Sequence, residues 1–251
     1  MSELNKYFIK WACSLSGCNG GDPKADIWIS GIEPGLDKGS QEDYYCKDLP
    51  KKIKETDQNI SIKYEWDQHI KYTYGQRLAK LYHSIKYPSK DIKDYKKNIT
   101  DSSQFNPLFN ANLYPIAFNS VDPKLWKEYN LKKLTGFEDK HLFKIWCFLN
   151  RFPTISKIVK RESPKLIIGT GVTYLTDFFS CYSSGIEMNN AIQSAQICEK
   201  DPKKRKYYWS KLNNGTTIVV IPFLSGPSGL NSDVLLQKMG GTLRKLVPDL
   251  F

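Results

Sequence analysis

Short apolar runs bounded by Gly, Pro, Asn or Ser recur four times along the chain, and such runs predict buried β-strands. They cover residues 25–30, 110–118, 165–171 and 217–224. Apolar residues at helical spacing predict helices over residues 3–13, 73–85, 141–161, 172–179 and 231–247. Strands that alternate with helices form a parallel sheet with helices on both faces. We therefore predict an α/β fold with three layers (α/β/α) and a central four-stranded parallel sheet.

Polar segments interrupt this pattern twice. Residues 36–70 are charged and rich in lysine, and we expect an insertion of irregular structure there. A second insertion covers residues 181–215. It leads into a basic hairpin arm over residues 199–217, because Asn214-Gly215 is a typical hairpin turn. We find no internal repeat, and we predict one domain over residues 1–251 that carries both insertions.

The charge balance indicates a polyanionic partner. The chain has 37 Lys and Arg against 26 Asp and Glu, a formal net charge of +11. Lysine and arginine laid on phosphates release counterions, so a nucleic acid is the favoured partner, and a basic protein without such a partner is the alternative. The N-terminus lacks the pattern of a signal peptide, and no apolar run has the length of a bilayer span. We expect a monomer in the cytoplasm, with reduced thiols and no membrane association.

Three of the predicted strands end in unusual loops. The first ends in Gly31-Ile32-Glu33-Pro34-Gly35, the second contains Asn112 and Pro115, and the fourth is followed by Ser225–Leu230. Ligands bind outside the carboxyl ends of parallel strands, so these loops should meet on one rim of the sheet. A carboxylate fixed at Glu33 can position a water molecule or stabilise a cationic transition state, although an exposed turn glutamate is the simpler reading. Ser225–Leu230 offers a phosphate cradle before a helix, or only a plain connection.

Other candidate chemistry fails on its spacing. Gly169–Tyr174 lacks the third glycine of a dinucleotide fingerprint. His69, His83 and His141 have no metal-ligand spacing with one another. Cys13 and Cys18 lack the second pair that a zinc site or a cluster requires. We therefore predict neither a metal nor another cofactor.

Four short motifs together resemble the uracil-DNA glycosylase superfamily. ADIWISGIEPG resembles its first motif, GPSGLN its second, NLYPIAF the Asn-Leu-x-Pro segment of the single-strand-selective monofunctional branch, and SPKLIIGTG its third strand. Their order agrees with the superfamily over residues 13–247, apart from the two insertions. The resemblance implies a monofunctional enzyme that flips a base out of DNA and hydrolyses its N-glycosidic bond, leaving an abasic site.

The resemblance also implies roles for particular residues. Glu33 takes the place of the Asp or Asn that positions the attacking water. Asn112 would read the edge of the flipped base, Tyr45 would stack on it, and Leu230 would fill the gap that the base leaves. The full set implied by the resemblance is Glu33 for catalysis, Ile32, Tyr45, Asn112 and Gly226 at the base, and Pro34, Gly35, Pro227, Ser228, Gly229, Leu230 and Asn231 on the DNA strand.

Two departures from the superfamily bear on the substrate. Gly226 stands where relatives carry His or Asn, which leaves room for a larger base or marks lost chemistry. Cys13, Cys18 and Cys147 fall near the positions of cluster ligands, but Tyr114 stands where another thiol is needed, so no cluster is inferred. A divergent branch that removes bulky glucosylated cytosines from phage DNA is one comparison. An ordinary repair glycosylase for uracil or a deaminated base, and an inactive DNA-binding module on the same fold, are the alternatives.

Overall fold

The computed structural model describes residues 5–37, 39–55, 63–100, 107–118 and 122–250. A seven-stranded mixed sheet runs through it in the order β1-β3-β2-β4-β7-β6-β5. The strands are β1 (Gly20–Gly21), β2 (Ile27–Gly31), β3 (Phe109–Asn112), β4 (Leu166–Thr170), β5 (Gln193–Gln196), β6 (Lys206–Lys211) and β7 (Thr217–Ile221). The central strands β3, β2, β4 and β7 are mutually parallel, whereas β1, β6 and β5 pair antiparallel at the edges. The prediction of an α/β fold is confirmed, but the sheet is wider and mixed.

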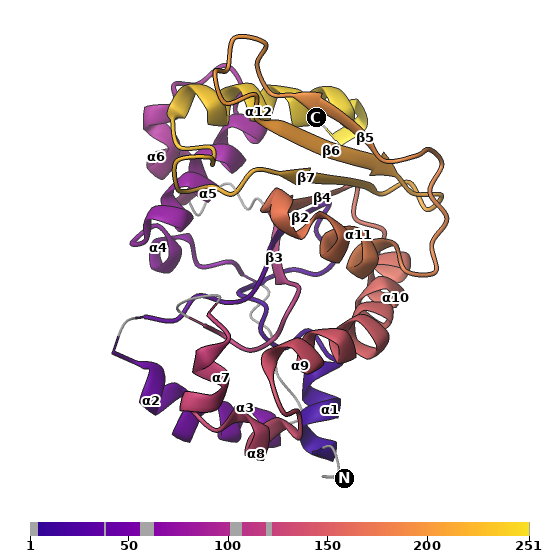
Figure 1. Ribbon diagram of the computed structural model, residues 1–251. Coiled ribbons are helices and arrows are strands. Elements are labelled where there is room, and N and C mark those ends of the chain that lie inside the picture. Colours follow the sequence, from indigo (N-terminus) through magenta and orange to yellow (C-terminus); the bar gives the residue numbers. More distant parts are fainter. Residues whose placement is uncertain (1–4, 38, 56–62, 101–106, 119–121, 251) are drawn as a thin grey trace.

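Helices cover both faces of this sheet (Figure 1). Successive strand residues point to opposite faces, so Ile27 and Ile29 join one apolar core while Trp28 joins the other. The first core packs against α5 (Thr73–Lys86) and α12 (Asp233–Leu246), which also contact each other. The second core lies on the other face, against helices from both halves of the chain. They are α1 (Lys6–Ala12), α3 (Leu49–Lys54), α9 (Lys140–Trp146), α10 (Phe152–Glu162) and α11 (Leu175–Ser183).

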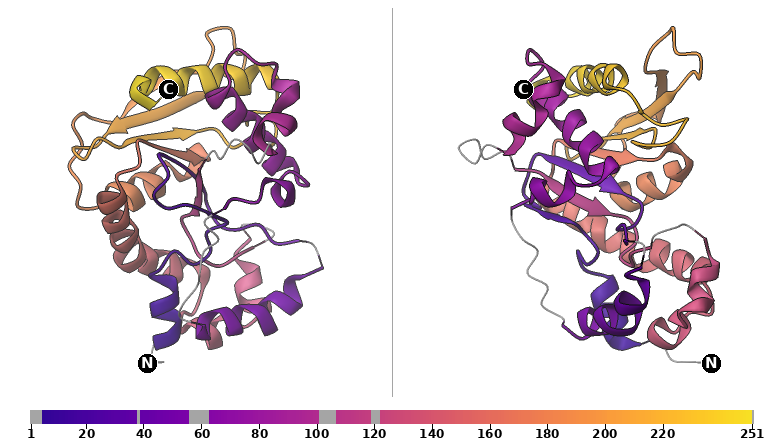
Figure 2. Two further views of the ribbon diagram at one scale, coloured as in Figure 1. Left: turned by 180° about the vertical axis from the view of Figure 1, so that it is seen from behind. Right: turned by 90° about the vertical axis from the view of Figure 1, so that its left-hand side faces the viewer.

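The remaining helices are short and lie around this frame. They are α2 (Gln41–Asp43), α4 (Trp66–His69), α6 (Tyr95–Thr100), α7 (Lys124–Glu128) and α8 (Leu131–Thr135). A π-helical turn over Tyr44–Asp48 joins α2 to α3, and another over Cys147–Arg151 joins α9 to α10. Figure 2 shows from two further sides that α2, α3, α7 and α8 gather at the end of the molecule away from α12. Within the described residues, no helix has both the length and the apolar character needed to span a bilayer.

Both predicted insertions are more ordered than the sequence indicated. In the described part of residues 36–70, α2, α3 and α4 replace the irregular structure that we predicted, and residues 56–62 lie outside the described residues. Ile53 and Leu49 are fully buried there, because the lysines of α3 cover only one side of an amphipathic helix. The Asn214-Gly215 turn is confirmed, with Gly215 at φ 89°, but it joins β6 to β7. The basic arm is therefore a continuation of the main sheet.

Candidate active site

A cavity of about 470 Å³ opens where β2 and β3 end side by side. Glu33 and Ile32 reach it from the loop after β2, and Asn110 and Asn112 reach it from β3. Parallel strands bring their carboxyl ends to one edge, which is why residues almost 80 positions apart meet here, as the pairing of Gly31 with Asn112 shows. The prediction that the first two loops share one rim is confirmed.

Backbone hydrogen bonds hold the Glu33 loop against the chain that follows β3. The N–H groups of Leu113, Tyr114 and Phe118 donate to the carbonyls of Gly31, Ile32 and Pro34 at 3.2, 2.9 and 3.1 Å. A Cβ at Gly31 would lie 2.5 Å from the Asn112 Oδ1 atom, so any other residue there would displace the Asn112 side chain. The loop is therefore a fixed platform rather than an exposed turn.

Glu33 forms a buried ion pair with a lysine that the sequence did not indicate. Lys140, at the start of α9, donates to Oε1 at 3.2 Å and lies 3.0 Å from Oε2. The side chains are only 8% exposed for Glu33 and 4% exposed for Lys140. The ammonium group also lies 3.6 Å from the centroid of the Phe118 ring. Oε2 is buried and, apart from this ion pair, accepts no directed hydrogen bond from the described residues.

The environment of Glu33 shifts its acid–base equilibrium. Burial raises the pKa of the carboxyl group, and the positive charges of Lys140 and, more weakly, Lys144 oppose that rise. Burial likewise lowers the pKa of Lys140, opposed by the charge of Glu33. A carboxyl group whose pKa lies above its usual range, set at the edge of a cavity, is a candidate for proton transfer or water activation.

Replacing Lys140 by Met is expected to move the acid limb of the pH–activity profile to higher pH. The substitution removes the cation that lowers the pKa of Glu33, so the carboxylate becomes protonated at a higher pH while burial is unchanged. Lys140→Arg keeps the charge and should leave the limb near its original position. Lys132→Met is the control, because Lys132 pairs with Glu138 on the surface. A limb that stays in place in Lys140→Met would contradict this assignment.

Asn112 is fixed with a defined polarity. It is 4% exposed, and its Nδ2 atom donates to the Gly17 carbonyl at 2.8 Å. This hydrogen bond identifies the nitrogen and uses one of its two hydrogens, so the carbonyl oxygen and the second amide hydrogen are left for a ligand. The backbone of Asn112 is held in turn, since its carbonyl accepts a hydrogen bond from Arg151 at 3.2 Å.

Aromatic rings form the walls of the cavity, but Tyr45 is not among them. Tyr74 stacks on Phe223 with centroids 5.4 Å apart, and both rings and Phe118 line the cavity. Tyr45 instead packs against Phe118 and Tyr129 and donates its hydroxyl hydrogen to Ala117 O at 2.9 Å. The rings that line the cavity are therefore those of Tyr74, Phe223 and Phe118 rather than that of Tyr45. Tyr45 lies in the lysine-rich insertion, and for that reason its position relative to the cavity was not predictable from the motif.

The loop after β7 differs from its predicted role at two positions. Leu230 is fully buried in the core beneath α12, and its N–H donates to Phe223 O at 2.8 Å, so it cannot fill a gap in DNA as folded here. Gly226 is exposed at φ 78° with no atom within 4 Å of a built Cβ, and it does not line the cavity. Phe223, just before this loop, is the residue of the segment that lines the cavity.

The rest of this loop lies at the surface. Pro227 and Ser228 are exposed, whereas Gly229 is buried. The Pro227 carbonyl accepts hydrogen bonds from Lys203 at 2.5 Å and Arg205 at 3.2 Å. Asn231 donates from Nδ2 to Gly226 O at 3.3 Å. Basic residues of the β5–β6 segment therefore brace the loop, and its exposed part remains open to a phosphate.

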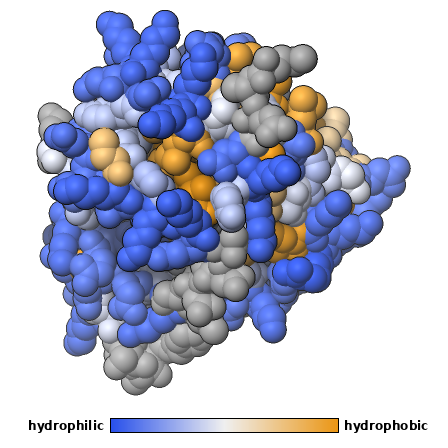
Figure 3. All heavy atoms as spheres, turned by 90° about the horizontal axis from the view of Figure 1, so that it is seen from below, coloured by the Kyte–Doolittle hydropathy of each residue, from blue (hydrophilic) through white to orange (hydrophobic). Residues whose placement is uncertain are grey.

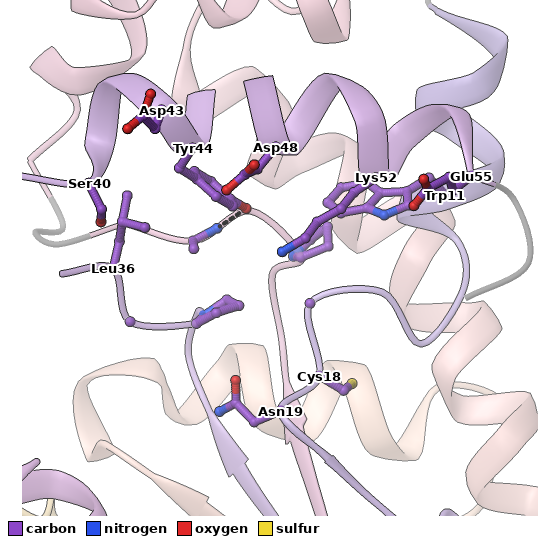
Figure 4. Close-up of a pocket in the computed structure, with 15 residues that line it drawn as sticks. Trp11, Cys18, Asn19, Leu36, Ser40, Asp43, Tyr44, Asp48, Lys52 and Glu55 are labelled. Carbon is purple, nitrogen blue, oxygen red and sulfur yellow. Dashed lines mark hydrogen bonds between the residues drawn. The ribbon is translucent and has the colours of Figure 1, made fainter. Parts of the chain in front are cut away.

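A second cavity of about 690 Å³ adjoins the first one and is drawn in Figure 4. The two share Asn19, Gly35 and Leu36, and Pro34 lines only the second. Polar side chains from the α2–α3 segment line its far wall, and in Figure 4 Asp48 and Lys52 extend from the helix toward the hollow. Tyr44 is fixed in this wall because its hydroxyl accepts a hydrogen bond from Ala117 N at 3.1 Å.

The thiols near the predicted cluster positions surround an arginine. Burial raises the pKa of Cys13, Cys18 and Cys147, and the positive charge of Arg151 acts on all three. Within the described part of the chain, no group of three or more His, Cys, Asp or Glu side chains is placed to hold a metal ion. Tyr114, at the position of the missing thiol, donates its hydroxyl hydrogen to Asp177 at 2.6 Å.

Comparisons of the chain with models of protein families, with characterised proteins and with solved structures found no match. The residues of the cavity therefore carry the functional argument. Sequence reasoning missed several of them: Asn19, Tyr64, His69, Tyr74, Asn110, Phe118 and Phe223. It also missed Lys140, which lies behind the cavity lining as the ion-pair partner of Glu33. Only Asn110 had a usable signal, since it lies two residues before Asn112 on one strand and so faces the same side.

Proposed function

We propose that this protein is a DNA glycosylase that hydrolyses the N-glycosidic bond of a flipped, non-standard base. One observation carries the proposal: Glu33 and Asn112, from two adjacent strand ends, line a single cavity walled by aromatic rings. A carboxylate, a hydrogen-bonding amide and stacking rings are the groups that a flipped base and its scissile bond require. The motif resemblance to the uracil-DNA glycosylase superfamily supports the same reading.

In this proposal Glu33 acts on the sugar and Asn112 acts on the base. The Glu33 carboxylate orients a water molecule toward the anomeric carbon, and its negative charge stabilises the cationic sugar that forms as the base departs. Asn112 holds the edge of the base, and stacking on Tyr74 or Phe223 recovers part of the cost of unstacking the base from DNA. The products are a free base and an abasic site.

The reaction is proposed to stop at the abasic site. Strand cleavage by a glycosylase needs an amine that reaches the sugar. The sequence motifs contain no such lysine, yet Lys140 lies beside Glu33. Its amine is occupied by the carboxylate and the face of Phe118, and it does not line the cavity. We therefore propose a monofunctional enzyme.

Space for a bulky base comes from a different place than the sequence indicated. Gly226 adds none, because it lies outside the cavity lining. The second cavity adds about 690 Å³ directly beside the first, and Asp43, Asp48 and Lys52 give its wall hydrogen-bonding capacity. We propose that a pyrimidine with a large polar substituent occupies this pair of cavities, since plain uracil would leave the second one empty. Antiphage defence against modified phage DNA is the setting that we propose for such a substrate.

The surface supports DNA as the macromolecular partner. The net charge is +11, and the exposed Pro227–Ser228 segment lies beside Lys203 and Arg205. Seen from below the molecule in Figure 1, hydrophilic side chains cover most of the face and a strip of apolar residues is exposed between them (Figure 3). A surface with both hydrophilic and apolar side chains suits a strand whose phosphates and bases are both contacted.

Abasic-site formation tests the proposed function. The protein is incubated with single- and double-stranded DNA that is unmodified, contains uracil, or comes from phage with hypermodified bases. We expect strand breaks only after alkali treatment, and only in the DNA with modified bases. Breaks in the uracil DNA alone would favour a repair glycosylase. DNA binding without breaks in any DNA would favour the inactive binding module.

A further inference from the structure

A groove outside the candidate active site combines a thiol with four cationic side chains. It lies between α12 and the segment that joins β5 to β6, and it has a volume of about 340 Å³. None of its lining residues belongs to either cavity described above. Its cationic residues are Lys200, Lys203, Arg205 and Lys238, and its thiol is that of Cys198. We call this hollow the basic groove.

The thiol of Cys198 is held by an ammonium group. Lys238, on α12, donates from Nζ to the Cys198 Sγ atom at 2.9 Å, and Cys198 is partly exposed to solvent. This hydrogen bond is the main reason that the pKa of the Cys198 thiol lies below its usual value. Burial has the opposite effect on four other thiols, whose pKa values it raises: Cys13, Cys18, Cys147 and Cys181. Cys198 is therefore the thiol whose surroundings favour the reactive thiolate.

The one acidic residue of the basic groove is already paired inside it. Asp201 Oδ1 accepts a hydrogen bond from Arg205 Nη1 at 2.6 Å, and Oδ2 accepts one from the Arg205 backbone N–H at 2.9 Å. No carboxylate of the groove is left to balance its three lysines. The Arg205 side chain is only 8% exposed, yet its Nε hydrogen has no acceptor among the described residues. A buried guanidinium donor without an acceptor, beside three lysines, indicates an anionic ligand from outside the chain.

We propose that Cys198 is a modification site that forms a mixed disulfide with a small anionic disulfide, such as glutathione disulfide. The Cys198 thiolate attacks one sulfur atom of the small disulfide and forms a bond to it. The original S–S bond breaks, and the departing thiolate takes a proton from water. Cys198 is oxidised, and half of the small disulfide is reduced to a thiol. The carboxylates of the bound half lie against the lysines of the basic groove, which select an anionic reagent over a cationic one.

Exposure and charge predict different sites for this reaction. Cys46 is the only one of the six cysteines that is exposed, so accessibility alone would favour it over Cys198. Reduced full-length protein is incubated without DNA and with limiting glutathione disulfide, and the adduct at each cysteine is followed over time by peptide mass spectrometry. Cys198 should react roughly 10-fold faster than Cys46, because more of it is thiolate and the lysines attract the reagent. With cystamine, a cationic disulfide, the ratio of the two rates should fall several-fold.

Variants of α12 make the outcome decisive. Lys238→Met removes the ammonium group and should lower the ratio of the Cys198 rate to the Cys46 rate several-fold, whereas Lys238→Arg should keep most of it. Lys245→Met changes an exposed lysine of the same helix outside the groove and should behave as wild type. Lys238 is exposed as well, so these substitutions leave the core intact.

Three results would each overturn the inference. They are modification of Cys46 at least as fast as that of Cys198, the same rate ratio with glutathione disulfide and with cystamine, and an unchanged ratio in Lys238→Met. The test measures no abasic sites and uses no DNA. Its outcome is therefore independent of the proposed glycosylase activity.

Discussion

Glu33→Gln protein is expected to form abasic sites about 10²- to 10⁴-fold more slowly than wild type in single-turnover assays. Glutamine keeps the shape of the side chain but cannot carry the negative charge that orients water and stabilises a cationic sugar. Among the described residues, Glu33 is the only carboxylate of the first cavity that is held in a buried ion pair. DNA binding should change little, because the loss falls on the chemical step.

Two controls make this result interpretable. Glu42→Gln alters an exposed glutamate on the nearby α2 and should retain wild-type activity. Thermal unfolding must be measured as well, because Glu33→Gln leaves the Lys140 ammonium group without its counter-charge. A folded Glu33→Gln protein with wild-type rates would remove Glu33 from the mechanism.

Arg151→Met is expected to lower the free energy of unfolding by about 3–5 kcal/mol, or to prevent folding. Arg151 is fully buried, and its guanidinium donates five hydrogen bonds to backbone carbonyls. These carbonyls belong to Ala12, Ser14, Ser16, Asn112 and Leu113. The arginine therefore joins the segment after α1 to the end of β3, and methionine would leave all five acceptors without this donor.

The measurement is chemical denaturation followed by circular dichroism. Arg161→Met is the matched control, because Arg161 lies on α10 with a side chain that is 69% exposed, and its loss should cost less than 1 kcal/mol. Arg151→Lys keeps the charge but not the planar guanidinium group with its several donors, so its free energy of unfolding should lie between those of wild type and Arg151→Met. A cost below about 1 kcal/mol for Arg151→Met would show that the two segments hold together without the arginine.

The sequence predicted the central strands and the main helices, because these elements follow from local patterns of apolar and polar residues. β2, β4 and β7 are buried on both faces, and α12 starts after Ser232, whose hydroxyl caps the helix by accepting a hydrogen bond from Leu235 N at 3.3 Å. The second strand was predicted over residues 110–118, which is longer than the observed strand β3. β3 ends at Asn112, since the chain after it turns to pair with the Glu33 loop.

The composition of the site was less predictable, because tertiary contacts assemble it. Glu33 and Asn112 could be named from motifs at strand ends, whereas Lys140 and His69 come from helices far away in the chain. Nothing local to Lys140 distinguishes it from the other lysines of this basic chain. Leu230 was misplaced for a related reason, since a leucine in a surface loop motif can equally close the core under α12.

The most direct test of the proposed function is mass spectrometry of DNA and free bases after incubation of wild-type protein with hypermodified phage DNA. We predict a released modified base and a DNA strand that is lighter by that base but otherwise unbroken. Intact DNA, with no released base, under conditions in which the protein binds that DNA would contradict the account.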